Sequence, residues 1–299
     1  MSTIIKLENV TKDYGQNRGV FNLNLEIEEG EVFGLVGING SGKTTTLRQM
    51  MGFIKPSNGK ITIDGKDAWK NASHLKKEIG YVPGEIAFPD TRTGVTFLKT
   101  QSEMIGIDNN SITNELIQAL KLDTDAIIKR MSKGMKQKTA IVDAFMPDTK
   151  ILLLDEPTTG LDPVMRDVFI EMILECKKRK KTIIMSSHMF NELEPTCDRI
   201  AFLKNGKIVN IIDTIDMAKI RAVNKVTIAF DTPEEFDHFR NQKVSIISDD
   251  KTKKTITVLI EEEELNHLFE LLSQYNIKDI IFDHQGLDDY FENHINLEA

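Results

Sequence analysis

The stretch VFGLVGINGSGKTTTLRQM, residues 32–50, decides the fold. It opens with the unbroken apolar run VFGLVG, which is typical of a strand buried on both faces of a parallel sheet. The glycines at 37, 40 and 42 then permit a tight loop whose backbone N–H groups turn inward. A helix is expected from about Gly42, with its positive N-terminal end facing the same concavity. The stretch therefore predicts an anion site between a strand and a helix.

The loop also carries the full pattern G-x-x-x-x-G-K-T. In that pattern Lys43 reaches the β- and γ-phosphates of a nucleotide, and Thr44 offers its hydroxyl to Mg²⁺. Glycine-rich turns are common between strands and helices, but the complete pattern in this setting indicates a nucleotide. The expected phosphate-binding residues are Gly37, Asn39, Gly40, Ser41, Gly42, Lys43, Thr44 and Thr45.

A second apolar strand, ILLLDEP at residues 151–157, ends in two acids. In phosphate-loop proteins the first of them, here Asp155, holds Mg²⁺ opposite the Thr44 hydroxyl. Glu156 lies just beyond the strand, where it can act on a water in line with the γ-phosphate as general base or orienting group. A strand end with solvated acids is the plain alternative.

The segment TIIMSSHMFNELEPTCDRI, residues 182–200, repeats the arrangement with His188 at a strand end. Ligands of open α/β sheets bind outside the carboxyl ends of the strands. We therefore expect His188 to make a polarising contact to the γ-phosphate.

Five segments occur in a fixed order: GINGSGKTT (37–45), MSKGM (131–135), ILLLDEP, TTGLD (158–162) and SSH (186–188). Together they resemble the nucleotide-binding subunit of an ATP-binding cassette (ABC) transporter, over roughly residues 3–215. The resemblance implies a P-loop NTPase fold of class α/β, with an antiparallel β-subdomain, a mainly parallel core and a helical subdomain. It also implies ATP hydrolysis with Mg²⁺.

The resemblance gives a role to the segment MSKGM. In this family the signature serine and glycine, here Ser132 and Gly134, bind the γ-phosphate held by a second subunit, in a head-to-tail dimer. Lys133 stands where a glycine is usual and Met135 where a glutamine is frequent. We expect function to survive these changes.

A second departure lies in IGYVPGE, residues 79–85, where the family usually has a glutamine after the proline. Gly84 occupies that position and has no side chain for a metal contact. Two alternatives stay open: Glu85 reaches the Mg²⁺, or water completes the metal shell.

Two further positions are carried over from the family. Tyr14 resembles the aromatic residue that stacks on adenine, although an exposed turn tyrosine is the alternative. Asp162 resembles the loop aspartate that communicates between the paired sites, and it would also suit a helix N-cap before Pro163.

Two domains are expected: an ABC ATPase domain at 1–215, with its helical subdomain at about 88–145, and a small α+β domain at 220–299. Alternating segments predict the antiparallel β-subdomain, and residues 96–106, 111–122 and 124–131 show helical spacing. In the family that the chain resembles, the helical subdomain meets a membrane protein, and the segment AFPDTRTG, residues 87–94, would line the docking groove. From about residue 220 the order β-α-β-β-α-β predicts a ferredoxin-like domain, followed by a helix at 286–295. We interpret this domain as regulatory or dimer-stabilising, without a metal site.

Composition limits the remaining choices. The chain has 299 residues and a net charge of −8, which argues against a nucleic-acid partner. The basic run at 177–181 is interpreted as a solvated helix end rather than a binding patch. No apolar run approaches the roughly 18–20 residues that span a bilayer, and the start resembles no signal peptide. Cys176 and Cys197 are expected to be packing residues in a reducing cytosol.

The resemblance implies an ATPase subunit at the cytoplasmic face of the membrane, bound to a separate permease and to a second ATPase subunit. An exporter of a drug, antibiotic or amphipathic peptide is favoured, because residues 80–85, the signature and the C-terminal domain resemble those of bacterial exporters. One alternative is a soluble ABC ATPase acting on ribosomes or DNA, which usually has two cassettes or a long coiled-coil insertion. Another is a binding switch that dimerises on ATP without turnover.

Overall fold

The computed structural model describes residues 2–89, 93–107, 111–221, 223–284 and 287. The chain divides into two compact units, Met1–Asp213 and Thr214–Ala299. Among the described helices, none combines the length and the apolar character needed to cross a bilayer.

The first unit opens with an antiparallel sheet in the order β2-β1-β4-β5. Its strands are β1 (Thr3–Asp13), β2 (Gly19–Glu28), β4 (Asn58–Ile63) and β5 (Lys66–Asp67). Alternation of buried apolar and more exposed residues is clearest in β2, and it suits a sheet with one covered face.

The second sheet has the order β10-β9-β3-β8-β7-β6. All neighbours in it are parallel except β10, which pairs antiparallel with β9. The strands are β3 (Val32–Val36), β6 (Ile79–Val82), β7 (Ile151–Asp155), β8 (Thr182–Ser187), β9 (Arg199–Lys204) and β10 (Lys207–Asp213). Because β3, β7 and β8 are parallel neighbours, their carboxyl ends share one edge, and the candidate residues follow these ends.

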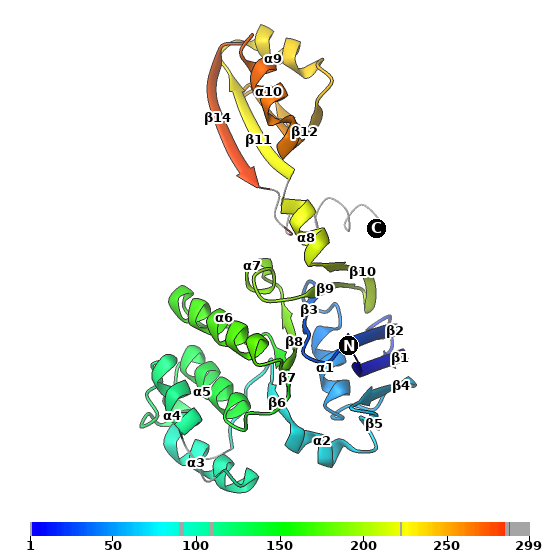
Figure 1. Cartoon of the computed structure of the whole chain (residues 1–299), viewed down its shortest axis with the longest axis vertical. Coiled ribbons are helices and arrows are strands. Elements are labelled where there is room, and N and C mark those ends of the chain that lie inside the picture. Colours follow the sequence, from blue (N-terminus) through cyan, green and yellow to red (C-terminus); the bar gives the residue numbers. More distant parts are fainter. Residues whose placement is uncertain (1, 90–92, 108–110, 222, 285–286, 288–299) are drawn as a thin grey trace. The chain divides into compact units, whose positions relative to one another are not determined.

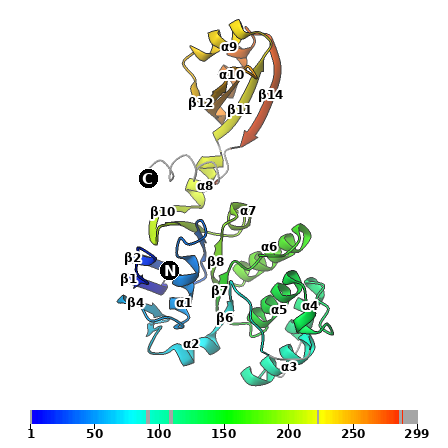
Figure 2. The ribbon, with the colours of Figure 1, turned by 180° about the vertical axis from the view of Figure 1, so that it is seen from behind.

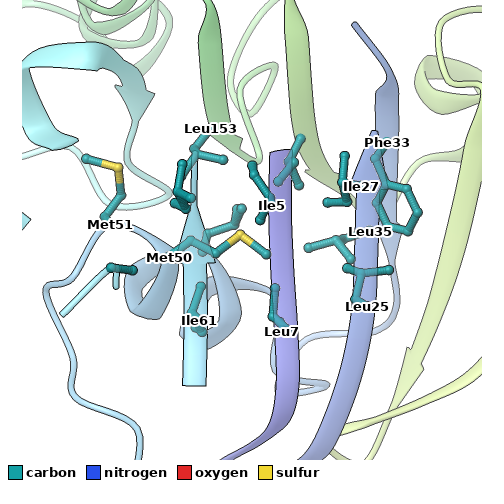
Figure 3. Close-up of a cluster of buried hydrophobic side chains, with 14 of the residues drawn as sticks. Ile5, Leu7, Leu25, Ile27, Phe33, Leu35, Met50, Met51, Ile61 and Leu153 are labelled. Carbon is teal, nitrogen blue, oxygen red and sulfur yellow. The ribbon is translucent and has the colours of Figure 1, made fainter. Parts of the chain in front are cut away.

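One apolar cluster joins the two sheets. Figure 3 shows Ile5, Leu7 and Ile61 of the antiparallel sheet gathered with Met50 and Leu35. Met50 belongs to α1 (Lys43–Met50), the helix that follows the phosphate loop. Burial of this cluster therefore fixes α1 between the sheets, and with it the loop at the start of α1.

The other helices of this unit cover the parallel sheet and form the helical subdomain. They are α2 (Ala72–Glu78), α3 (Gly94–Ile105), α4 (Ser111–Ala119), α5 (Lys133–Phe145), α6 (Pro163–Lys178) and α7 (Phe190–Leu193). In both views α3, α4 and α5 gather on the side of the unit away from β1 and β2 (Figures 1 and 2). The α/β class with antiparallel, mainly parallel and helical parts is confirmed.

One local expectation was wrong. Residues 124–131 form only a single 3-10 turn, Ile128–Arg130, because Ile127 pairs with Thr93 in a bridge and Asp123 accepts the N–H of Asp125 in a turn. The basic run 177–181 lies at the end of α6 and is exposed at 178–180, as expected of a solvated helix end, whereas Lys181 is buried and donates to the Thr149 carbonyl. Cys176 and Cys197 are buried and free, as expected of packing residues.

The second unit begins with α8 (Thr214–Arg221) and contains an antiparallel sheet in the order β12-β13-β11-β14. Its remaining elements are β11 (Val223–Phe230), α9 (Pro233–Arg240), β12 (Ser245–Asp250), β13 (Thr255–Glu261), the 3-10 turn Glu262–Glu264, α10 (Leu265–Leu272) and β14 (Ile277–His284). The helices α9 and α10 pack on one face of the sheet, in a core with Val226, Ile228 and Phe230. The ferredoxin-like order is thus confirmed. The helix expected at 286–295, apart from Leu287, and residues 90–92 of the expected groove lie outside the described residues.

Candidate nucleotide-binding site

A pocket of about 400 Å³ lies at the carboxyl edge of β3. It collects Tyr14 from the turn before β2, most of the phosphate loop, and Glu156 from beyond β7. Its lining is Tyr14, Asn17, Arg18, Gly19, Asn39, Gly40, Ser41, Gly42, Lys43, Thr44, Thr45, Glu156 and Asn205. The volume falls in the range of ordinary ligand pockets, about 300–1,000 Å³.

The phosphate loop closes tightly around Lys43. The Lys43 side chain is buried, and its Nζ donates to the Gly37 carbonyl at 2.6 Å. A Cβ on Gly37 would lie 2.4 Å from the Leu203 carbonyl oxygen, so only glycine fits there. The Ser41 N–H donates within the loop to the Ile38 carbonyl, which corrects the expectation that all loop N–H groups turn inward. The buried Ser41 Oγ has no partner among the described residues, which leaves one hydroxyl for a phosphate oxygen.

Thr44 and Asp155 meet beside the loop. The Thr44 hydroxyl donates to Asp155 Oδ1 at 3.2 Å, and the Ser186 hydroxyl donates to the same oxygen at 2.7 Å. Asp155 is fully buried, and in the described part of the chain its Oδ2 has no hydrogen-bond partner. A buried carboxylate oxygen beside a hydroxyl is a suitable donor set for Mg²⁺, which prefers oxygen ligands. The residues present therefore fit the metal.

Glu156 lies between two basic side chains. Its Oε1 is 3.3 Å from Lys43 Nζ, and its Oε2 is 3.0 Å from His188 Nδ1. Burial alone would raise the pKa of Glu156, but the charges of Lys43 and His188 outweigh burial and hold this pKa below its ordinary value. Glu156 is therefore ionised at neutral pH.

The backbone of Glu156 is also unusual. Its φ of 47° is left-handed, which is uncommon for a residue other than glycine. The Glu156 N–H donates to the Ser186 hydroxyl at 2.9 Å, which helps to hold this conformation. Sparsely populated backbone of this kind clusters at functional sites.

Gly84, rather than Glu85, lies against the Asp155 carboxylate. A Cβ on Gly84 would be 2.8 Å from Asp155 Oδ2. The side chain of Glu85 is 93% exposed, and its Oε2 is 3.9 Å from Arg48 Nη2. Glu85 as a metal ligand stays a prediction, and this geometry gives more support to the alternative in which water completes the metal shell.

Tyr14 lies at the open end of the pocket with its ring half exposed. Such a ring can stack on a base. The sequence reasoning missed four neighbours in the lining: Asn17, Arg18, Gly19 and Asn205. The position of Arg18, four residues after Tyr14, was the available signal, because a cation near a phosphate loop suits an anionic ligand.

The signature residues lie elsewhere in the unit. Among the described residues, the pocket lining includes neither Ser132 nor Gly134. The exposed Ser132 caps α5, where its Oγ accepts the Met135 N–H at 3.2 Å. A Cβ on Gly134 would lie 2.6 Å from the Gly160 carbonyl oxygen, so this glycine also permits close packing of α5 on the loop after β7.

Asp162 caps α6. Its Oδ1 accepts the Met165 N–H at 3.0 Å, and Pro163 occupies the first turn. Its role between paired sites stays a prediction.

The sequence is similar to those of known proteins. The family model described as ABC transporter matches residues 20–159. The bacitracin transport ATP-binding protein BcrA of Bacillus licheniformis is 30% identical in an alignment that covers 97% of each chain. The ABC transporter ATP-binding protein YtrB of Bacillus subtilis is 32% identical and covers 90% of this chain and 91% of its own.

Solved structures agree. An ATP-binding subunit of an ABC transporter superposes with a TM-score of 0.65 at 25% identity, over 72% of this chain and 92% of that chain. A bacterial ABC transporter cassette, MJ0796, solved as a dimer, has a TM-score of 0.64 at 26% identity, over 70% and 98%. The chain therefore belongs to the ABC transporter ATP-binding family, as an ATP-hydrolysing, nucleotide-binding subunit of a transporter.

Proposed function

We propose that two such subunits close head to tail on MgATP and power a separate membrane permease that exports a drug, antibiotic or amphipathic peptide. The subunit would work at the cytoplasmic face of the membrane. The observation that carries the proposal is the position of Glu156, which lies between Lys43 and His188 at the phosphate loop.

In this proposal Lys43 binds the β- and γ-phosphates. The Lys43 ammonium group then pairs with the γ-phosphate instead of with Glu156. The Glu156 carboxylate becomes available to orient a water molecule in line with the γ-phosphate. Once Glu156 no longer pairs with the Lys43 ammonium group, its pKa would rise toward that of a useful base. His188 holds the second oxygen of Glu156 and faces the transferred phosphoryl group.

Thr44 and Asp155 would hold Mg²⁺ beside this cluster. When bound, the metal neutralises charge on the β- and γ-phosphates. Asp155 is kept in place by the Ser186 hydroxyl, so its free oxygen keeps one direction.

Each site would be completed by Ser132 and Gly134 of the other subunit. Three features support this: Ser132 is exposed, it caps a helix whose N-terminal end favours an anion, and it is absent from the lining of the described pocket. The related MJ0796 cassette was solved as a dimer.

The exporter assignment depends on the relatives. BcrA, which is named for bacitracin transport, matches 97% of the chain and therefore most of the second unit. We propose the second unit, Thr214–Ala299, as a regulatory or dimer-stabilising domain of that exporter class.

The test is to isolate the tagged chain from its native cells in mild detergent and to identify what accompanies it. A stoichiometric polytopic membrane protein is expected, and cells without this chain should become more sensitive to bacitracin-like peptides. Isolation of the chain with ribosomes or DNA would support the soluble alternative instead. ATP-dependent dimers without any turnover would support the switch.

A further inference from the structure

Glu192 is a buried carboxylate that the proposed reaction does not use. It belongs to α7, just after His188, and only 2% of it is exposed. The Thr158 hydroxyl donates to Glu192 Oε1 at 2.6 Å, and the Ser187 hydroxyl donates to Glu192 Oε2 at 2.8 Å. In the part of the chain that the structure describes, no lysine or arginine pairs with this carboxylate.

The two hydroxyls come from the two segments that carry the reacting groups. Thr158 lies two residues after Glu156, in the loop that follows β7. Ser187 is the last residue of β8 and directly precedes His188. Ser187 Oγ also accepts the Met189 N–H at 2.9 Å, so the backbone on both sides of His188 is fixed to the same hydroxyl.

The loop after Glu156 is also held by α5, the helix that the signature residue Ser132 caps. The buried Gln137 of α5 donates from Nε2 to the Pro157 carbonyl at 2.7 Å. Thr158, the next residue, is the one that reaches Glu192. The loop after Glu156 is therefore bonded to both α5 and α7, and Glu192 supplies the contact from α7.

We infer that Glu192 is a positioning residue that holds Glu156 and His188 in register by bonding Thr158 and Ser187 at once. This inference rests on the proposed roles of Glu156 and His188. Without the link, the direct bonds of Glu156 to Ser186 and His188 remain, but the loop after Glu156 and the turn after His188 lose the carboxylate that holds both of them. Because displacement of a reacting group by about 1 Å can cost roughly a hundredfold in rate, the effect should fall on turnover rather than on nucleotide binding.

The experiment compares steady-state ATP hydrolysis by the full chain with that of Glu192→Ala and Glu192→Gln. We expect Glu192→Ala to lower kcat about ten- to hundredfold, with KM changed by less than about threefold. Glu192→Gln should recover most of the activity, because an amide can still bond both hydroxyls. Wild-type kcat in Glu192→Ala, or an equal loss in Glu192→Gln, would overturn the inference.

Glu31→Ala is the matched control for stability. Glu31 is another buried carboxylate, paired with Arg199 beside the amino end of β3, away from the phosphate loop. The variant Glu31→Ala should lower the Tm and leave kcat unchanged. A matching fall of kcat in this variant would reduce Glu192 to a purely structural residue.

Two further variants keep the inference testable if Glu192→Ala does not fold. Thr158→Val and Ser187→Ala each break one half of the link, so their combined effect on kcat should be no larger than either alone. If the double variant lowers kcat by the product of the two single effects, the two hydroxyls do not act through one link. Glu156→Gln is measured in parallel: normal turnover in that variant would reject the proposed catalytic role, whereas its inactivity beside a fully active Glu192→Ala would reject only the positioning role.

Discussion

The Lys43 ammonium group lies 3.3 Å from Glu156 Oε1, so the cation of the phosphate loop and the candidate base are already paired. The pairing helps to hold the pKa of Glu156 below its ordinary 4.5 despite partial burial. Its stabilising effect is present above pH 4.5 and is lost as the pH falls through the folded-state pKa. A bound γ-phosphate competes for the same ammonium group, which links nucleotide binding to the state of Glu156.

Glu156→Gln should reduce ATP turnover at least about a hundredfold, because a neutral amide neither accepts the proton nor orients water as strongly as a carboxylate. ATP binding should persist, since Lys43 and Thr44 are untouched. Dimers should therefore accumulate with MgATP, as measured by light scattering. The exposed acid Glu171 of α6 provides the control, and Glu171→Gln should behave as wild type. Strictly monomeric Glu156→Gln at saturating MgATP, in the presence of the membrane partner, would contradict the proposed dimer.

Much of the pocket could be predicted because its signals are local. The glycine spacing fixes a loop between β3 and α1, and the rule that ligands bind at strand ends places Asp155, Glu156 and His188 at one edge. The structure puts Glu156 within bonding distance of both His188 and Lys43.

Other features depend on contacts between distant segments and leave no local pattern. The approach of Gly84 to Asp155 joins positions 71 residues apart, and only the packed sheet reveals it. The bonds of Glu192 to Thr158 and Ser187 are of the same kind. Helical spacing at 124–131 misled because spacing does not register a pairing such as Thr93 with Ile127.

Gly84→Gln installs the residue that this family usually carries, yet it should weaken Mg²⁺-dependent binding of ATP. A Cβ 2.8 Å from Asp155 Oδ2 forces the loop or the carboxylate to move. The measurement is a Mg²⁺ titration of fluorescent ATP binding, which needs no turnover, and the midpoint should rise about tenfold or more. Gly84→Gln with a lower midpoint would mean that the loop moves freely and accepts the side chain.

Glu85→Gln decides between the two alternatives for the metal shell. The exposed position of Glu85 leads us to expect an unchanged Mg²⁺ midpoint in the same titration. A clear shift would instead establish that Glu85 reaches the metal when nucleotide is bound.

Tyr14→Ala should raise the KM for ATP about tenfold, the effect of losing one base–aromatic stack. The KM for GTP should rise by a similar factor, because stacking tolerates different bases. Tyr14→Phe keeps the ring and should match wild type. A change in kcat without a change in KM would contradict the stacking role.

Asp143→Asn should stabilise the protein at neutral pH. Burial raises the pKa of Asp143 from 3.8 to about 6, although the hydrogen bond from Gln101 opposes the shift. Between these values the folded state binds more protons than the unfolded state, so stability falls as the pH rises, and the full cost is present above pH 6. The variant should therefore gain up to about 3 kcal/mol in the free energy of unfolding at pH 7.5 and much less at pH 4. Urea denaturation at both pH values measures this, and an equal gain at both would exclude titration as the cause.

Ser132→Asp separates the structural role of the signature serine from its proposed role in the dimer. Ser132 caps α5 by accepting the Met135 N–H, and aspartate caps helices equally well, so the Tm should stay close to that of wild type. The added negative charge, however, would face the γ-phosphate of the partner subunit and should abolish ATP-driven dimerisation. Binding of ATP to the monomer should be unchanged, because Ser132 is not among the described lining residues of the chain's own pocket. Ser132→Ala is the complementary variant: it should lose about 1 kcal/mol of capping energy but retain weak dimerisation. ATP-dependent dimers of Ser132→Asp as stable as those of wild type would mean that α5 does not meet a phosphate across the interface, and the head-to-tail arrangement would have to be abandoned.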